Sequence, residues 1–200
     1  MGRKKSYDRE ALIDKAMAIF RERGFARTSA EMLVAELGVN RYSLYAEFGS
    51  KQRLFDAALQ RYDEEVLGRN FGPLEAPGAG LQEVRELLEF FGTASSGPAG
   101  GRGCLLCNTA VEFGPDDPSG EGFVKRYFER VSRAFFVALE NARHEGELPG
   151  GIDTWSEASF FTASVLGMFV MLRAKAPVSV IESAARVSIH HLDTLRAGRG

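Results

Sequence analysis

The sequence predicts an all-α protein, with a small N-terminal helix-turn-helix domain and a larger helical bundle. Apolar residues recur at spacings of three and four along successive segments, and strand-like alternation does not persist anywhere. Glycines and short polar residues separate these segments, as is typical of helix ends. The chain has 200 residues and is 44% hydrophobic, so it can bury a core without disulfides or metals.

The first part of the chain predicts two helices. One covers about residues 8–23, and Gly24 ends it with a left-handed cap. The second begins at Thr28, because Thr28 and Glu31 have the spacing of a capping box. Gly38 ends this second helix.

Two more helices follow within the small domain. Asn40 is the predicted N-cap of a short helix that Gly49 closes, and Ser50 caps a longer one. The stretch 67–80, LGRNFGPLEAPGAG, is the predicted junction between the domains because it is rich in glycine and proline.

We therefore divide the chain into domains at 1–67 and 80–200. Apolar stripes indicate that the second domain is also helical. Its predicted helices cover about 81–91, 104–113, 124–142, 154–175 and 178–196.

Composition favours a cytoplasmic protein that does not associate with membranes. The chain does not start like a signal peptide, and its longest apolar run, 158–172, is shorter than the roughly 18 residues of a membrane span. Two cysteines at a spacing of three do not make a secreted disulfide framework.

Charge is unevenly distributed along the chain. Residues 1–53 carry 11 Lys/Arg against 7 Asp/Glu, whereas residues 54–200 carry 14 against 20. A basic head on an acidic body favours a polyanionic partner at one end. Random scatter is the alternative, since the excess is small.

Residues 28–48 have the order helix, glycine turn, helix. In a helix-turn-helix motif, the second helix enters the DNA major groove by its N-terminal residues. Arginine bonds guanine edges, and asparagine and serine bond bases or phosphates. The alternative is that the tyrosines simply pack on the surface. The predicted DNA contacts of the second helix are Asn40, Arg41, Tyr42, Ser43 and Tyr45.

Further contacts are predicted where helices begin, because free backbone N–H groups attract phosphate. Thr28 and Ser29 start one helix, and Lys51 follows the Ser50 cap of another. The basic residues at 3–5 form an arm that would add sequence-independent affinity.

Residues 11–59 resemble the DNA-binding domain of TetR-family transcriptional regulators. The resemblance lies in the F-x-x-x-G-F-x-x-T-S segment, the L-G-V turn and the S-L-Y-x-x-F-G-S-K run. It implies an all-α homodimer with a ligand-binding C-terminal domain, and usually repression that a small-molecule effector relieves. It also implies phosphate contacts for Tyr45 and Lys51 and base-facing positions for residues 41–43.

One position departs from that family pattern. Many members carry His-Phe before the glycine, where this chain has Glu47 and Phe48. A carboxylate near DNA is unfavourable unless it accepts from a cytosine amino group or points away. The operator sequence is therefore not predicted.

The run GRGCLLCNTAVEFGPDDP, residues 101–118, resembles a G-C-L-x-x-N-x-A-x-E segment of some TetR-like regulators. Cys104 and Cys107 share a helix face near a helix N-terminus beside Arg102, and both effects lower a thiol pKa. The pair is therefore a candidate sensor of electrophiles or oxidants. The alternative is that both are small buried hydrophobic residues.

Asn108 and Glu112 share a face of the same predicted helix. They are either polar contacts of an effector pocket or surface groups. A metal site is not expected, because the cysteine pair supplies two ligands and the histidines at 144, 190 and 191 lack finger spacing. No cofactor is expected.

The segment 154–175 is too apolar for the surface of a monomer. Together with 178–196 it is expected to form half of a four-helix interface between two copies, which places two recognition helices on a palindromic operator of double-stranded DNA. The alternative is an intramolecular core helix.

These features predict a ligand- or thiol-responsive DNA-binding regulator, most often a repressor, and not an enzyme. Two alternatives stay open from the residues alone. One is a thiol-dependent enzyme that uses Cys104 with Cys107, and the other is a helical protein that only sequesters an apolar compound.

Overall fold

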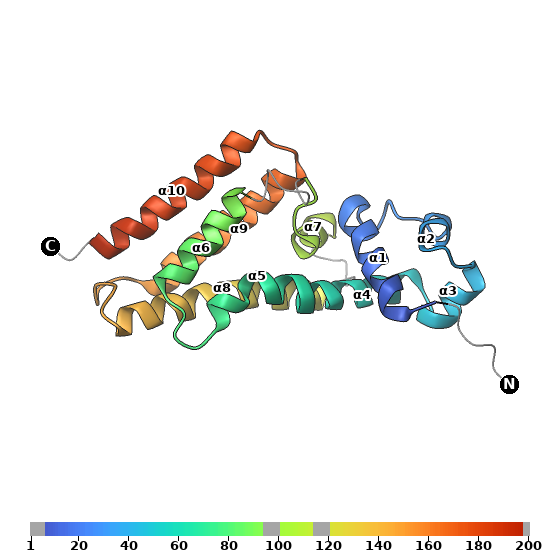
Figure 1. Cartoon of the computed structure of the whole chain (residues 1–200), viewed down its shortest axis with the longest axis horizontal. Coiled ribbons are helices and arrows are strands. Elements are labelled where there is room, and N and C mark those ends of the chain that lie inside the picture. Colours follow the sequence, from blue (N-terminus) through green and yellow to red (C-terminus); the bar gives the residue numbers. More distant parts are fainter. Residues whose placement is uncertain (1–6, 94–100, 114–120, 198–200) are drawn as a thin grey trace.

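The computed structural model describes residues 7–93, 101–113 and 121–197, which form helices and no strands, as predicted. Figure 1 shows a small N-terminal domain, the head (residues 7–62), at one end of an elongated bundle, the body (residues 63–197). The head contains α1 (Arg9–Arg23), α2 (Ala30–Leu37), α3 (Arg41–Phe48) and α4 (Lys51–Tyr62). The body contains η1 (Asp63–Leu67), α5 (Gly68–Glu75), α6 (Leu81–Thr93), α7 (Leu105–Glu112), α8 (Glu121–His144), α9 (Thr154–Arg173) and α10 (Val178–Ala197).

Short polar side chains begin each helix of the head. Each of them accepts a backbone N–H two or three residues further on, which satisfies a donor left free at the helix start. The caps are Asp8, Ser29, Asn40 and Ser50. The predicted caps at Asn40 and Ser50 are therefore confirmed.

The predicted cap at Thr28 is wrong. Ser29 caps α2 instead, and Thr28 is fully buried with its hydroxyl donating to the carbonyl of Gly24 at 2.6 Å. Gly38 is left-handed, with φ 69° and ψ 28°, as predicted. Gly24 also has a positive φ of 83°, but its ψ of 172° leads the chain away in an extended direction.

The head continues into the body as one helical run from Lys51 to Glu75. Within the stretch 67–80, the predicted domain junction, residues 68–75 form α5 despite Pro73 in its last turn. Burial outweighs the local preference of glycine and proline, because Phe71 and Leu74 are completely buried.

A π-helical turn, η1, interrupts this run where the head ends. Such turns displace the regular hydrogen-bond ladder, and here the N–H of Gly68 donates to the carbonyl of Asp63. Arg130 of α8 adds a second donor to this carbonyl at 3.1 Å and also bonds the Asp63 carboxylate at 2.9 Å. The same guanidinium bonds the Glu75 carboxylate at 2.5 and 2.8 Å, so one arginine ties the first residue of η1 to the last residue of α5.

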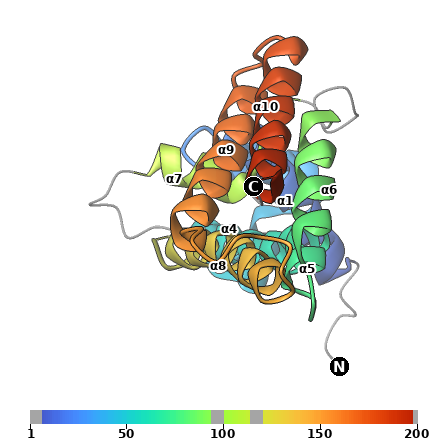
Figure 2. The ribbon, with the colours of Figure 1, turned by 90° about the vertical axis from the view of Figure 1, so that its left-hand side faces the viewer.

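The body is a two-layer bundle. Figure 2 shows α5 and α8 side by side in one layer, with α6, α9 and α10 crossing above them, in agreement with the helix contacts. α9 packs on α8 and α10. By length and mean hydropathy alone, α9 is also the one helix in the described ranges that could cross a membrane. The largest completely buried side chains of the body include Phe71, Phe91, Tyr127, Phe135 and Phe161.

We expect Gly92→Ala in α6 to lower the free energy of unfolding by about 1–3 kcal/mol. A Cβ at Gly92 would lie 2.7 Å from the Cβ of Ala185 in α10, which is closer than real carbon contacts. Gly72→Ala in α5 is the matched control, because its Cβ would meet nothing within 4 Å. We expect Gly72→Ala to raise the same free energy by about 0.5–1 kcal/mol.

Urea unfolding at one fixed protein concentration measures both variants. Equal free energies for the two variants would contradict the close packing of α6 on α10.

Candidate nucleic-acid interface and effector region

α3 turns an apolar side inward and a polar side to solvent. Leu44 and Phe48 are buried in the head, whereas Arg41 and Tyr42 project outward, and Tyr42 is 84% exposed. An aromatic side chain this exposed contributes little to packing. The outer face of α3 is therefore available to another molecule.

Arg41 already interacts with its surroundings on this face. Its guanidinium pairs with Glu31 of α2 at 2.8 Å and lies over the ring of Tyr45, 5.7 Å from the centroid. Backbone and Ser29 hydrogen bonds, with Arg41 nearby, lower the pKa of Glu31, so this carboxylate is charged at neutral pH. Because an exposed ion pair contributes little to stability, Arg41 can exchange Glu31 for a base or a phosphate at small cost.

Ser29 and Asn40, two of the predicted DNA contacts, use their side-chain oxygens as helix caps. The Ser29 hydroxyl oxygen accepts from Met32 at 3.2 Å, and the Asn40 carbonyl oxygen accepts from Ser43 at 2.8 Å. The Asn40 amide group keeps two donors, whereas the one donor of the Ser29 hydroxyl bonds the Glu31 carboxylate. The Asn40 side chain can therefore still donate to DNA, and Ser29 would first have to release Glu31.

Two other predicted contacts, Thr28 and Lys51, lie at the inner side of the motif. Thr28 is buried, so its hydroxyl does not reach the surface of the head. The Lys51 ammonium donates to the carbonyls of Phe25 and Thr28, both at 3.0 Å, and lies 4.0 Å from the centroid of the Phe25 ring. Lys51 thus ties α4 to the α1–α2 turn, and one of its three donors is left for a phosphate.

Glu47 does not lie on the exposed face of α3 that carries Arg41 and Tyr42. It accepts from the hydroxyl of Tyr7 at 3.2 Å and lies 3.5 Å from the guanidinium of Arg9, with a side chain only 8% exposed. The departure from the family's His-Phe pattern therefore places no exposed carboxylate beside α3. The basic arm predicted at 3–5 lies outside the described residues.

The cysteine pair is buried. Cys104 is 0% and Cys107 5% exposed. Burial, and secondarily the neighbouring Cys104, raises the pKa of Cys107 to about 12. The prediction of a lowered pKa is therefore wrong for Cys107, because the cost of burying a thiolate exceeds any benefit of the helix N-terminus.

Two buried tyrosines accompany the cysteines. Burial is the main cause that raises the pKa of Tyr62 and of Tyr127, and Cys104 adds to both shifts. The Tyr127 hydroxyl is inaccessible to solvent and makes no well-formed hydrogen bond within the described part of the chain, although a weak interaction with the Cys104 thiol contributes to its raised pKa. Sequence patterns gave no sign of this group, because Tyr127 lies in an ordinary apolar stripe.

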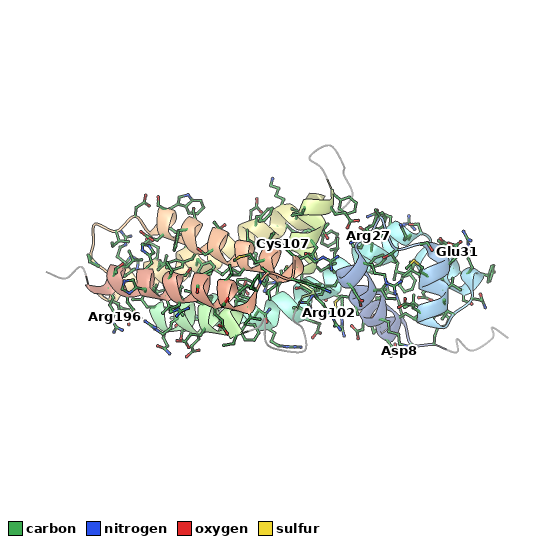
Figure 3. All side chains as sticks on the ribbon, turned by 90° about the horizontal axis from the view of Figure 1, so that it is seen from above. Asp8, Arg27, Glu31, Arg102, Cys107 and Arg196 are labelled. Carbon is green, nitrogen blue, oxygen red and sulfur yellow. The ribbon has the colours of Figure 1, made fainter. Side chains whose placement is uncertain are left out.

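Asn108, the third predicted effector residue, does not face these tyrosines. Its amide donates to the carbonyls of Arg102 at 3.0 Å and Arg21 at 3.4 Å. Figure 3 shows Arg102 and Cys107 at the end of the body that meets the head. Asn108 is therefore not an isolated surface group: it lies between the two domains and lines a hollow there.

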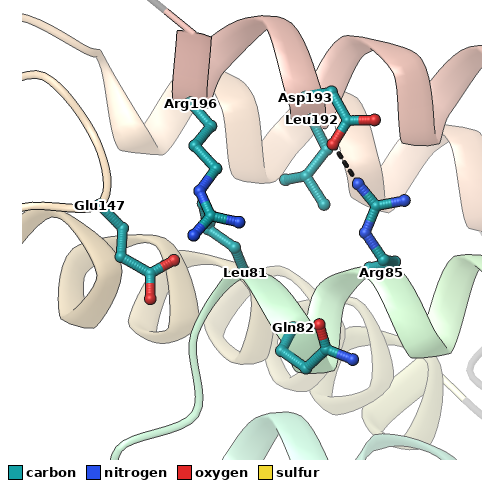
Figure 4. A pocket seen from close by; sticks show the side chains of 7 residues that line it. All are labelled: Leu81, Gln82, Arg85, Glu147, Leu192, Asp193 and Arg196. Atoms are coloured by element: carbon teal, nitrogen blue, oxygen red, sulfur yellow. Dashed lines mark hydrogen bonds and ion pairs between the residues drawn. The ribbon is translucent and has the colours of Figure 1, made fainter. Parts of the chain in front are cut away.

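Hollows in the described surface lie at both ends of the body. Figure 4 shows one of about 150 Å³ at the end far from the head, where Arg85 pairs with Asp193 of α10. Another, of about 240 Å³, lies at the junction with the head, where Gly24, Asn108 and Arg173 contribute to its wall. Across the residues that the structure describes, no cluster of three His, Cys, Asp or Glu side chains could hold a metal.

α9 and α10 expose apolar side chains that their packing within the chain does not cover. Small residues between them, including Gly167, leave room for a second helix to approach. These exposed side chains are Trp155, Phe160, Val170, Val178, Val180 and Val187.

A helix-turn-helix head with an open recognition helix, joined to an all-helical body, defines a DNA-binding regulator. The model for bacterial regulatory proteins of the tetR family matches residues 12–58. The model for the tetracyclin repressor-like C-terminal domain matches residues 80–187. The chain therefore belongs to the TetR family of transcriptional regulators, whose members bind DNA as dimers and are not enzymes.

Relatives match over almost the whole chain. The uncharacterized HTH-type transcriptional regulator YezE of Bacillus subtilis is 32% identical, over 96% of this chain and 100% of its own. The HTH-type transcriptional repressor ComR of Escherichia coli is 28% identical, over 94% of this chain and 90% of its own. A cysteine mutant of the regulator CifR, solved with a 26-base-pair operator DNA, is 25% identical with a TM-score of 0.81, covering 94% of this chain and 98% of that one.

We expect iodoacetamide at pH 8 to label Cys107 slowly in the folded protein and rapidly in urea. A pKa of about 12 instead of the ordinary 9.0 lowers the thiolate fraction roughly a thousandfold. Mass spectrometry of timed samples measures the modification. Equal labelling rates in the folded and unfolded protein would contradict the burial of this thiol.

The same pKa sets the sign of a pH effect. The folded protein holds the Cys107 proton more tightly than the unfolded chain does. The contribution of this thiol to the free energy of unfolding is therefore fully present below pH 9 and is lost as the pH rises towards 12.

Proposed function

We propose that the chain is a homodimeric repressor that binds a palindromic operator through α3 and leaves it when a small apolar effector binds the body. The exposed face of α3 carries this proposal, because Arg41 and Tyr42 face solvent from a helix that the Asn40 cap and the buried Leu44 hold in place. Binding of operator DNA would be a cytoplasmic activity.

Different residues would contribute affinity and specificity. Arg41, with Tyr42 and Ser43, would face base edges in the major groove, where each good pair discriminates by about 1–3 kcal/mol. Tyr45 and Lys51 would hold phosphates and fix the register of the helix. The Lys51 ammonium is already positioned by two carbonyls, which supports the phosphate contact.

The dimer would form through α9 and α10. The exposed apolar side chains of these helices, among them Phe160 and Val187, would be covered by the same helices of a second copy. Two-fold symmetry then presents two α3 helices to two half-sites. CifR bound to operator DNA has a similar fold, which supports the described orientation of head and body as the DNA-binding one.

A small apolar effector is favoured over an electrophile. Both cysteines are buried, and the raised pKa of Cys107 disfavours the reactive thiolate. The Tyr127 hydroxyl is buried without a well-formed hydrogen bond among the described residues, and such a group costs about 1–3 kcal/mol. An apolar ligand with one polar group would supply the missing partner.

We expect Arg41→Ala to weaken operator binding about tenfold to a hundredfold without changing thermal stability, because an Arg–base contact is worth about 1–3 kcal/mol. The operator is first selected from random duplex DNA, and affinity is then measured by fluorescence anisotropy at several salt concentrations. Arg196→Ala is the charge-matched control, because Arg196 lies at the opposite end of the molecule (Figure 3). Equal loss in both variants would show a purely electrostatic effect and contradict base recognition by α3.

We expect Tyr127→Phe to raise the free energy of unfolding by about 1 kcal/mol, since it removes an unsatisfied buried polar group. Urea unfolding measures this difference, with Tyr45→Phe on the head as the control. A loss of stability would reveal a partner for the hydroxyl inside the protein and remove the argument for an effector there.

A further inference from the structure

The head and the body meet at the turn between α1 and α2. The carboxylate of Glu112, the last residue of α7, accepts two backbone N–H groups of this turn, one on each oxygen. Phe25 donates at 2.9 Å and Ala26 at 2.7 Å. A carboxylate from the body thus binds the head through two adjacent peptide groups.

Three more side chains join the same two surfaces. Arg173, the last residue of α9, donates to the carbonyls of Arg21 at 3.2 Å and Glu22 at 2.6 Å. Asn108 of α7 also reaches the Arg21 carbonyl, at 3.4 Å, and Arg21 itself donates to the carbonyl of Gly103 at 2.7 Å. The accepting carbonyls on α1 belong to its last turn, where they lack helical partners and carry the negative end of the helix dipole.

Two glycines allow this close packing: Gly24 lets the head approach Glu112, and Gly103 lets its loop lie against α7 and α9 within the body. At Gly24, with φ 83°, an added Cβ would lie 2.7 Å from a Glu112 carboxylate oxygen. At Gly103, with φ 64°, it would lie 3.0 Å from the carbonyl of Phe169 and 3.1 Å from the Asn108 side chain. Other residues at either position would be strained and would push the partners apart.

The opposite end of α7 lies in the core of the body. Cys104 and Cys107 are buried there, beside the phenols of Tyr62 and Tyr127. The N–H of Asn108 donates to the carbonyl of Cys104 at 2.8 Å, so one helical turn separates the buried cluster from the contacts with the head. A short rigid helix therefore connects the region proposed for the effector with the α1–α2 turn.

We propose that Glu112, Asn108 and Arg173 are positioning residues for DNA recognition, which hold the head at the angle that fits the operator. This inference rests on the proposed operator binding. We call the three residues the inter-domain clamp.

The inter-domain clamp is built to be released without unfolding. Glu112 is exposed, so water can replace its two hydrogen bonds at small net cost. The core of the head does not depend on it, since α1 packs on α4 and α4 runs on into the body. Without the inter-domain clamp the head samples more orientations relative to the body. A smaller fraction of the molecules then has the orientation that fits the operator, so the apparent affinity for DNA falls.

Glu112→Gln tests the clamp with almost no change in shape. Glutamine has one acceptor oxygen, so one of the two N–H groups loses its partner and faces an amide NH₂ instead. We expect the variant to bind the selected operator about fivefold to twentyfold more weakly than the wild type, with an unchanged melting temperature. Glu129→Gln on α8 is the matched control, because Glu129 is exposed and has no hydrogen bond or ion pair within the described ranges.

Two further readouts separate positioning from direct contact with DNA. The slope of affinity against salt should stay unchanged, because no phosphate contact is lost. The amides of Phe25 and Ala26 should exchange hydrogen faster in Glu112→Gln than in the wild type. Arg173→Ala, a change on a different helix, should weaken operator binding in the same direction.

The outcomes are distinct. If the wild type binds an operator and both Glu112→Gln and Arg173→Ala bind it with the same affinity as the wild type, the inter-domain clamp is overturned and the proposed function stays intact. Failure of the wild type to select any operator overturns the proposed function instead. A fall in the salt slope of Glu112→Gln would assign its effect to altered phosphate contacts and also overturn the positioning role.

Discussion

The turn at residues 24–26 is the constraint on which the arrangement of the two domains depends. The ring of Phe25 packs on Phe55 of α4, with centroids 4.9 Å apart, and on Phe113 of the body at 5.5 Å. Its carbonyl accepts from Lys51, and its N–H donates to Glu112. One residue thus joins the core of the head, the start of α4 and the end of α7, so none of these can move without affecting the others.

The body holds the head at two places that differ in strength. On one side α4, η1 and α5 form an unbroken helical run, and Arg130 ties its π turn to α8. On the other side the head is held by hydrogen bonds to the end of α1 and to the α1–α2 turn, several of them exposed, and by the packing of Phe25 on Phe113. The head is therefore expected to pivot about the continuous helical run when these hydrogen bonds are released, while the fold is kept.

Local signals in the sequence predicted most of the fold and the face of α3. Caps such as Asn40 and the left-handed Gly38 depend on neighbouring residues alone. The helical spacing of apolar residues likewise indicates which face of each helix is buried. Local signals failed at 68–75, where tertiary burial of Phe71 outweighs glycine and proline, and at Cys107, whose pKa depends on burial. The roles of Asn108 and Glu112 involve partners more than 80 residues away, which no local spacing encodes.

In the proposed function, two copies of this chain bind one duplex through their heads. Sedimentation of the selected, fluorescently labelled operator with the protein measures this directly, because each protomer adds 21.9 kDa to the complex. We expect one complex with the mass of the duplex and two protomers on the full palindrome, and far weaker binding to a single half-site. A complex that contains one protomer, or equal affinity for the full and the half site, would contradict it.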